Sequence, residues 1–213
     1  MKSRALAALL AACLFVCVAG CGRAGGGGQV VVKPTPDERV RLGAFMALTG
    51  DTAQYGISAL NGLRMAVEEA NAAGGVGGRR VELIVQDTRS DATETEVVVR
   101  RLVEESRVHA LVGEVVSSRS LAAARVAQAS GVPMLTPSAT SPELTAVGDY
   151  VFRSCYTDTF QGVALARFTV ESLGVRNAAL LVDRDQRYSV ELARLFREDF
   201  ERRGGKIVAE QSY

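Results

Sequence analysis

Hydroxyl side chains are concentrated in three short segments of this 213-residue chain. The segments are 48–56 (LTGDTAQYG), 113–120 (GEVVSSRS) and 136–143 (TPSATSPE). Serine and threonine hydroxyls both donate and accept hydrogen bonds. The segments do not show a nucleophile paired with a base, as covalent catalysis requires. The pattern therefore favours a site that holds a polar solute over a site that transforms one.

Ser117 and Ser118 stand where we expect a helix to begin. The first N–H groups of a helix lack partners within the helix, and together with the helix dipole they attract an anion. A serine in this place also commonly caps the helix. Two roles therefore remain for Ser117, as a ligand-binding residue or as a cap.

Three further features argue against an enzyme. Residues 74–80 (GGVGGRR) resemble a phosphate loop, but they follow an expected helix and precede an expected strand, the reverse of what such a loop requires. There is no G-x-S-x-G motif. His109, the only histidine, directly precedes an expected buried strand and has no evident partner. We expect no catalytic residue, no metal site and no cofactor.

The charge balance bears on the possible partners. Lysine and arginine number 25 against 24 aspartates and glutamates, so the formal net charge is +1. Proteins that bind the phosphate backbone of nucleic acids carry a pronounced excess of positive charge. Nucleic acid is therefore not an expected partner. An apolar content of 47% is sufficient for a buried core.

The first 20 residues have the pattern of a bacterial lipoprotein signal peptide. Lys2 and Arg4 precede an apolar run at 5–18 that is too short to span a bilayer comfortably. The run ends in VAGC, which matches a lipobox and makes Cys21 the expected lipidation site; ordinary cleavage beside an incidental cysteine is the alternative. Residues 21–37, with four consecutive glycines and two prolines, predict a flexible tether. We expect a lipid-anchored protein of the cell envelope, periplasmic or on the outer face of the membrane.

The elements that would position the hydroxyl-rich segments alternate regularly from residue 38 onward. Apolar spacing predicts strands at 39–45, 81–86, 110–113, 132–135 and 150–153, and helices at 56–73, 91–106 and 121–130. It then predicts helices at 160–173 and 190–203 and strands at 178–182 and 206–209. This alternation is typical of an α/β fold in which helices cover both faces of a parallel sheet.

The predicted elements form two units. Residues 38–153 suffice for a first ligand-binding lobe, and residues 154–213 begin a second lobe with only two strands. Because a half-built parallel sheet leaves an edge uncovered, we interpret the sequence as truncated. Ligands of open α/β sheets bind beyond the carboxyl ends of the strands, which is where the three hydroxyl-rich segments lie.

Four stretches resemble a known family of receptors. They are ALTGDTAQYG, NGLRMAVEEANAAGGVGG, LTPSATSPELT and RSCYTDTFQG. In order and spacing they are similar to the type I periplasmic binding proteins for leucine, isoleucine and valine, from about Val40 to the last residue. The resemblance implies two flavodoxin-like lobes that close on a ligand, with the second lobe incomplete here. It also implies the extracytoplasmic solute-binding component of an ABC importer, with a branched-chain or related amino acid as ligand and a membrane permease as partner.

The resemblance implies roles for residues of the first lobe. Ser117 matches the serine that receives the α-carboxylate of the ligand. Ser138, Ala139 and Thr140 match the segment whose backbone and threonine hydroxyl hold the carboxylate and the ammonium group. Tyr55 matches an aromatic residue that lines the first-lobe side of the cleft.

The second lobe contributes two further residues by the same resemblance. Tyr188 matches a tyrosine that closes over the ligand. Asp158 lies in a D-x-x-Q-G motif, and an aspartate there faces the ammonium group in amino-acid-sensing relatives; its other possible role is to cap the following helix. Many transport receptors of the family carry a first-lobe disulfide, but its positions here correspond to Ser90 and Val116, so that bond is absent.

Two other functions remain compatible with these residues. One is an exported sensor of the same fold that reports its ligand to a membrane partner. The other is an importer receptor for an amide, urea or an aromatic acid, which the hydroxyl-rich segments would also accommodate.

Overall fold

A computed structural model describes residues 39–213. The predictions for the signal peptide at 1–20, the lipidation site Cys21 and the tether at 21–37 lie outside the described residues. Among residues 39–213, no helix combines the length and the apolar character that crossing a membrane requires.

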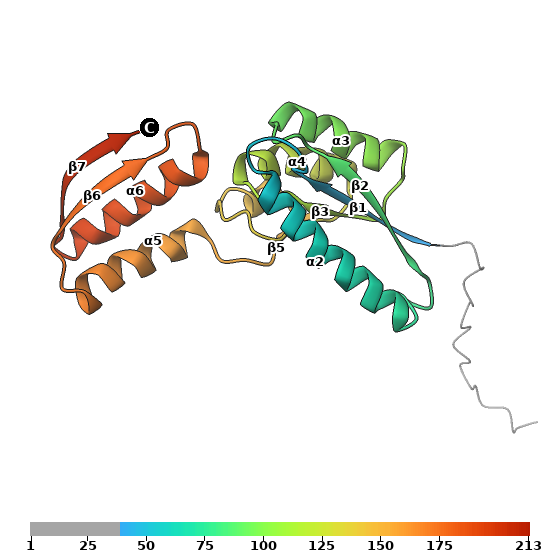
Figure 1. The fold of residues 1–213 in the computed structure, drawn as a ribbon, viewed down its shortest axis with the longest axis horizontal. Coiled ribbons are helices and arrows are strands. Elements are labelled where there is room, and N and C mark those ends of the chain that lie inside the picture. The colour runs from blue at the N-terminus through green and yellow to red at the C-terminus, as the bar shows by residue number, and fades with distance from the viewer. Residues whose placement is uncertain (1–38) are drawn as a thin grey trace, which may run out of the picture. The chain divides into compact units, whose positions relative to one another are not determined.

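A five-stranded parallel sheet organises the first part of the chain (Figure 1). Its strands lie in the order β2-β1-β3-β4-β5, and every neighbouring pair is parallel. This is the flavodoxin-like order, whose switch point lies between β1 and β3. The predicted α/β fold with a flavodoxin-like parallel sheet is therefore confirmed. The strands are β1 (Val40–Met46), β2 (Val81–Asp87), β3 (Ala110–Gly113), β4 (Met134–Thr136) and β5 (Val151–Arg153).

Helices cover both faces of this sheet. Successive side chains of a strand point to opposite faces, and β1 shows the consequence. Phe45 packs into the cluster formed with α3 and α4, whereas Ala44 and Met46 pack with Leu60 of α2 on the other face. The helices are α2 (Ala53–Ala72), α3 (Ala92–Glu104) and α4 (Ser117–Ser130), followed by a 3₁₀ turn, η1 (Thr145–Val147).

A second, two-stranded parallel sheet pairs β6 (Asn177–Val182) with β7 (Lys206–Ser212). It is preceded by α5 (Asp158–Arg167), which continues into a π-helical turn, η2 (Phe168–Ser172), and its strands are joined by α6 (Arg187–Arg202). The buried residues Ala166, Val170 and Phe200 pack both helices against one face of this sheet. Leu181, on β6, is 69% exposed. Within residues 39–213, the prediction of helices on both faces thus holds for the first sheet and not for the second.

Four helices begin earlier than apolar spacing predicts. The expected starts were residues 56, 121, 160 and 190, whereas the helices start at Ala53, Ser117, Asp158 and Arg187. Their first turns are mostly polar, so an apolar stripe does not mark them. These first turns follow strand ends, and so they lie where a ligand would be held.

Asp91 and Glu94 have the spacing of a capping box, but only one half of it forms at the start of α3. The Asp91 carboxylate accepts a hydrogen bond from the Glu94 N–H at 2.7 Å. The reciprocal bond is absent, because the Asp91 N–H donates to the Thr88 carbonyl oxygen at 2.9 Å. A tight turn after β2 therefore satisfies the Asp91 N–H, the group that the glutamate of a capping box would otherwise reach.

Candidate ligand-binding site

A cavity of about 800 Å³ opens at the carboxyl ends of the strands. This volume is in the range of cavities that hold small molecules. Its lining comes from the segments after β1, β3, β4, β5 and β6 and from the N-terminal turns of α2, α4, α5 and α6. The lining residues are Thr52, Tyr55, Ser58, Ala59, Val115, Val116, Ser117, Pro137, Ser138, Thr140, Tyr156, Gln161, Asp183, Gln186 and Tyr188.

Ser117 is the first residue of α4, and its side chain is 3% exposed. The N-cap position belongs to Val116, and no side chain caps this helix. The capping role considered for Ser117 is therefore wrong. Because Val116 and Ser117 line the cavity, the unpaired N–H groups of the first turn of α4 are available to an anion there.

The turn after β4 brings two more predicted residues to the cavity. Ser138 and Thr140 line it, and the Ser138 hydroxyl donates to the Val115 carbonyl oxygen at 3.0 Å. Ala139 is buried and does not line the cavity, and its N–H donates to the Thr136 hydroxyl at 3.1 Å. Ala139 therefore holds the turn in place through its backbone N–H, while Ser138 and Thr140 present polar atoms to the cavity.

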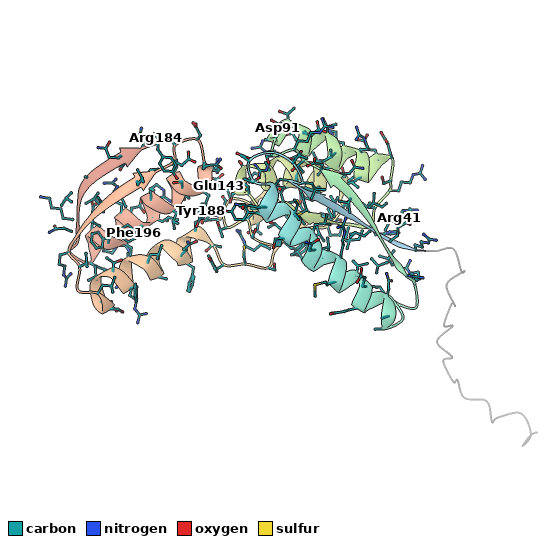
Figure 2. All side chains as sticks on the ribbon, in the orientation of Figure 1. Arg41, Asp91, Glu143, Arg184, Tyr188 and Phe196 are labelled. Atoms are coloured by element: carbon teal, nitrogen blue, oxygen red, sulfur yellow. The ribbon has the colours of Figure 1, made fainter. Side chains whose placement is uncertain are left out.

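Tyr55 and Tyr188 line the cavity from α2 and from the first turn of α6. Figure 2 labels Tyr188, whose hydroxyl accepts a hydrogen bond from the Gln161 side-chain amide at 3.0 Å. Gln161 belongs to the D-x-x-Q-G motif and also lines the cavity. The amide thus fixes the orientation of the tyrosine ring, a role that sequence reasoning did not assign.

Asp158 is fully buried and does not line the cavity. Neither of its carboxylate oxygens accepts a hydrogen bond from residues 39–213. Loss of solvent raises the pKa of this carboxyl group above its ordinary range; the nearby Thr140 hydroxyl, although not in hydrogen-bonding geometry, partly offsets that rise. The capping role considered for Asp158 is wrong, because Thr157 caps α5 by accepting the Phe160 N–H at 3.3 Å.

Sequence reasoning missed the lining residues that the second sheet contributes. Asp183 and Gln186 follow β6. The rule that ligands bind beyond strand ends, applied to this sheet as it was to the first, would have found both. Thr52 lies in the hydroxyl-rich segment 48–56, but nothing in the sequence distinguishes it from the other polar residues of that segment. Among residues 39–213, no group of three or more His, Cys, Asp or Glu side chains could hold a metal ion.

Comparisons with known proteins agree with this geometry. A family model described as "Periplasmic binding protein" matches residues 39–213. A leucine-, isoleucine-, valine-, threonine- and alanine-binding protein of Pseudomonas aeruginosa is 33% identical over 172 residues, which are 80% of this chain and 46% of that protein. The Leu/Ile/Val-binding protein of Escherichia coli K12 is 28% identical over the same shares. The chain thus spans about half the length of the curated relatives it matches.

Solved structures show the same similarity. The branched-chain amino acid transporter substrate binding protein LivJ of Streptococcus pneumoniae, in complex with isoleucine, superposes with a TM-score of 0.78 at 34% identity; the match covers 83% of this chain and 50% of that one. The leucine binding protein LivK of Thermotoga maritima gives 0.77 at 35% identity, over 82% and 49%. The sequence match and the shared parallel α/β fold lead to one conclusion. The chain belongs to the periplasmic binding protein family.

Proposed function

We propose that this protein is the extracytoplasmic solute-binding component of an ABC importer and that it binds a branched-chain or related amino acid. Residues 38–153 would form the first ligand-binding lobe, and residues 154–213 the beginning of the second. The relatives named above support the ligand class, because their names specify leucine, isoleucine and valine among their ligands.

One observation carries the proposal: the first turn of α4 and the Ser138–Thr140 turn line the same cavity. The α4 end supplies unpaired N–H groups and the Ser117 hydroxyl, which suit an α-carboxylate. The Thr140 side chain supplies a hydroxyl that donates or accepts. An amino-acid zwitterion needs donors for its carboxylate and acceptors for its ammonium group, and hydrogen bonds to charged groups are about twice as strong as neutral ones.

The remaining lining suits an apolar side chain of the ligand. Tyr55, Ala59, Val115 and Pro137 contribute apolar surface from the first sheet and its helix α2. Tyr188 adds a ring from α6, and its hydroxyl is already engaged by Gln161. Contacts made by both parts of the chain with one ligand would stabilise the closed arrangement, which is how ligand binding drives hinged closure.

Export and membrane attachment complete the proposed function. The leader at 1–20 and the lipobox cysteine Cys21 would anchor the protein at the cell envelope, where it would deliver its ligand to a permease. A Cys21→Ser variant should leave the membrane fraction, whereas the native sequence should remain there. A Cys13→Ser variant is the control, because that cysteine lies within the leader. Membrane retention of Cys21→Ser would contradict the anchor.

Isothermal titration calorimetry of the complete gene product against the twenty amino acids tests the ligand class. We expect saturable heats with L-leucine, L-isoleucine or L-valine and weaker or no heats with charged amino acids. A panel in which every amino acid is silent would reject the assignment. Urea, small amides and benzoate in the same titration would identify the other receptor type.

A further inference from the structure

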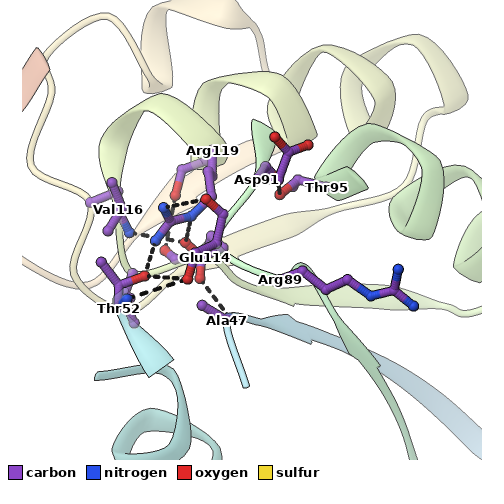
Figure 3. A network of polar contacts seen from close by, with 12 residues as sticks. Ala47, Thr52, Arg89, Asp91, Thr95, Glu114, Val116 and Arg119 are labelled. Atoms are coloured by element: carbon purple, nitrogen blue, oxygen red, sulfur yellow. Dashed lines mark hydrogen bonds and ion pairs between the residues drawn. The ribbon is translucent and has the colours of Figure 1, made fainter. Parts of the chain in front are cut away.

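A buried ion pair lies behind the cavity, at the start of α4. The Arg119 Nε atom donates to a carboxylate oxygen of Glu114 at 2.7 Å. The Glu114 side chain is 0% exposed and that of Arg119 is 5% exposed. Neither residue lines the cavity. Figure 3 shows the pair at the centre of a network of polar contacts.

The Glu114 carboxylate holds two backbone segments. One oxygen accepts the N–H of Ala47, the residue after β1, at 2.9 Å. The other accepts the N–H of Val116, the N-cap residue of α4, at 3.3 Å. A single carboxylate therefore fixes the end of β1 relative to the helix start that carries Ser117.

The Arg119 guanidinium extends the same network to two more segments. One terminal nitrogen donates to the Ser90 carbonyl oxygen, in the turn after β2, at 3.2 Å. The other donates to the Thr52 hydroxyl at 2.5 Å, just before α2. Thr52 itself lines the cavity. The planar fork of arginine suits this task, because it directs several donors in fixed directions.

The backbone of Glu114 reaches the remaining segment. Its carbonyl oxygen accepts the Thr136 hydroxyl at 2.6 Å and the Ser120 hydroxyl at 2.9 Å. Thr136 in turn accepts the Ala139 N–H, which fixes the turn between Ser138 and Thr140. Every segment that follows β1, β2, β3 and β4 is thus tied to Glu114, to Arg119 or to both.

The energetics indicate that this pair serves geometry more than stability. Removing two charges from water is costly, and replacing a buried pair with apolar residues of similar size is often neutral or stabilising. We propose that Glu114 and Arg119 are positioning residues that set the spacing between Thr52, Ser117 and the Ser138–Thr140 turn without touching the ligand. This inference rests on the proposed function of the cavity.

The test compares single and paired substitutions by thermal unfolding and by calorimetry with L-leucine. Glu114→Gln and Arg119→Met each leave a charged or polar partner unsatisfied, so both should unfold at lower temperature. In the double variant, Glu114→Leu with Arg119→Met, no charge is left buried without its partner, so the unfolding temperature should exceed that of Arg119→Met. It should stay below that of the native protein, because the Ala47 and Val116 N–H groups lose their acceptor. The affinity of the double variant for L-leucine should still be at least ten-fold weaker. A double variant that binds L-leucine as the native protein does would overturn the proposal.

Arg119→Lys addresses the case in which the double variant does not fold. A lysine keeps the charge beside Glu114 but lacks the fork that spans Ser90 and Thr52, so L-leucine affinity should fall while the unfolding temperature falls less than in Arg119→Met. Asp199→Asn is the matched control, because Asp199 is 3% exposed and pairs with Arg203 at 2.5 Å on α6, away from the cavity. It should lower the unfolding temperature and leave L-leucine affinity unchanged. Native affinity in Arg119→Lys would contradict a positioning role.

Amide hydrogen exchange without ligand separates this inference from the proposed function. In Arg119→Lys, exchange at Ala47, Val116 and Ala139 should become at least ten-fold faster, while Val98 and Val99 in α3 keep their native rates. If the native protein binds no amino acid, the proposed function fails, and the exchange rates still decide whether the pair orders the segments. Unchanged exchange at the three amides would overturn the inference in either case.

Discussion

The N–H of Asp158 donates a hydrogen bond to the carbonyl oxygen of Thr140 at 2.9 Å. This bond joins the first residue of α5 to the turn that presents the Thr140 side chain to the cavity. It also places a buried carboxyl group, without a hydrogen-bond partner among residues 39–213, next to that turn. A buried, unsatisfied polar group costs free energy on folding. Asp158 therefore destabilises the protein unless a bound group or a proton compensates.

Replacing Asp158 with Asn should stabilise the ligand-free protein at pH 7, by about 1–3 kcal/mol. Burial raises the pKa of Asp158 above its ordinary value of 3.8, so the folded state holds this proton more tightly than the unfolded chain. The free energy of unfolding of the native protein therefore falls as pH rises from about that ordinary value through the raised pKa. Thermal unfolding from pH 3 to pH 8 should show the Asn variant gaining its advantage over this window and losing it below.

The resemblance places the Asp158 carboxylate against the ligand's ammonium group, whereas in the structure this carboxylate is buried and does not line the cavity. A contact with the ligand would make Asp158→Asn bind an amino acid more weakly than the native protein. Stability and affinity would then move in opposite directions in one variant. A variant that is more stable than the native protein and binds the amino acid with the same affinity would show that Asp158 plays no part in binding. A variant that is less stable at pH 7 would contradict the account of an unsatisfied carboxyl group.

Truncating the two hydroxyls at the proposed anion-binding end should weaken binding selectively. Ser117→Ala and Thr140→Ala each should cost about 1–3 kcal/mol in affinity for L-leucine, because a charged ligand group then lacks one hydrogen bond. Ser118→Ala is the control, since Ser118 is its exposed neighbour in α4 and does not line the cavity. Calorimetry with L-leucine measures the affinity of each of the three variants. Equal affinities in all three would place the ligand elsewhere.

The tyrosine in α6 should contribute through its ring more than through its hydroxyl. Tyr188→Ala removes apolar surface from the cavity and should weaken L-leucine binding by about 1.5 kcal/mol or more, as expected for the loss of a large side chain. Tyr188→Phe loses only the bond with Gln161 and should cost about 0.5–1.5 kcal/mol, the typical contribution of one neutral hydrogen bond. A phenylalanine variant as weak as the alanine variant would instead assign the main role to the hydroxyl.

The sequence predicted the framework of the site better than its details. The strands were placed within about two residues at nearly every end, because buried apolar runs between turn residues mark them plainly; β7 is the exception and runs on to Ser212. Ser117, Ser138 and Thr140 were expected at the ligand-binding edge, and all three line the cavity. The rule that ligands bind beyond the carboxyl ends of strands sufficed for these residues, because each lies within four residues of a strand end.

The residues that fix this geometry could not be predicted in the same way. Glu114 and Arg119 are separated by a strand-to-helix turn, and no periodic pattern marks them as partners. Their contacts reach Ala47 and Ser90, which are distant in the sequence and become neighbours only when the parallel strands assemble. The network also joins Ser90 to Val116 through noncovalent bonds. By resemblance, these two positions correspond to those of the first-lobe disulfide. Side-chain burial, not sequence spacing, reveals its role.

Two glycines of α2, Gly56 and Gly62, differ in the space that surrounds them. A Cβ atom on Gly56 would lie 1.9 Å from the Ala47 carbonyl oxygen, in the segment that Glu114 holds. A Cβ atom on Gly62, in the same helix, would meet nothing within 4 Å. Alanine is favoured over glycine in a helix by about 0.8–1 kcal/mol, so helix propensity alone predicts that both Gly→Ala changes stabilise the protein.

The close approach of Gly56 to Ala47 should make alanine destabilising at this position, despite its higher helix propensity. Gly56→Ala must push α2 away from the end of β1, which overpacks a buried contact and should lower the free energy of unfolding by about 1–3 kcal/mol. Gly62→Ala should raise it by about 0.5–1 kcal/mol. Because Thr52 and Tyr55 lie in the turn beside Gly56 and line the cavity, L-leucine affinity should also fall in the first variant and stay constant in the second. Urea unfolding and calorimetry measure both quantities, and equal stabilisation by the two substitutions would show that the contact between α2 and Ala47 is looser than described.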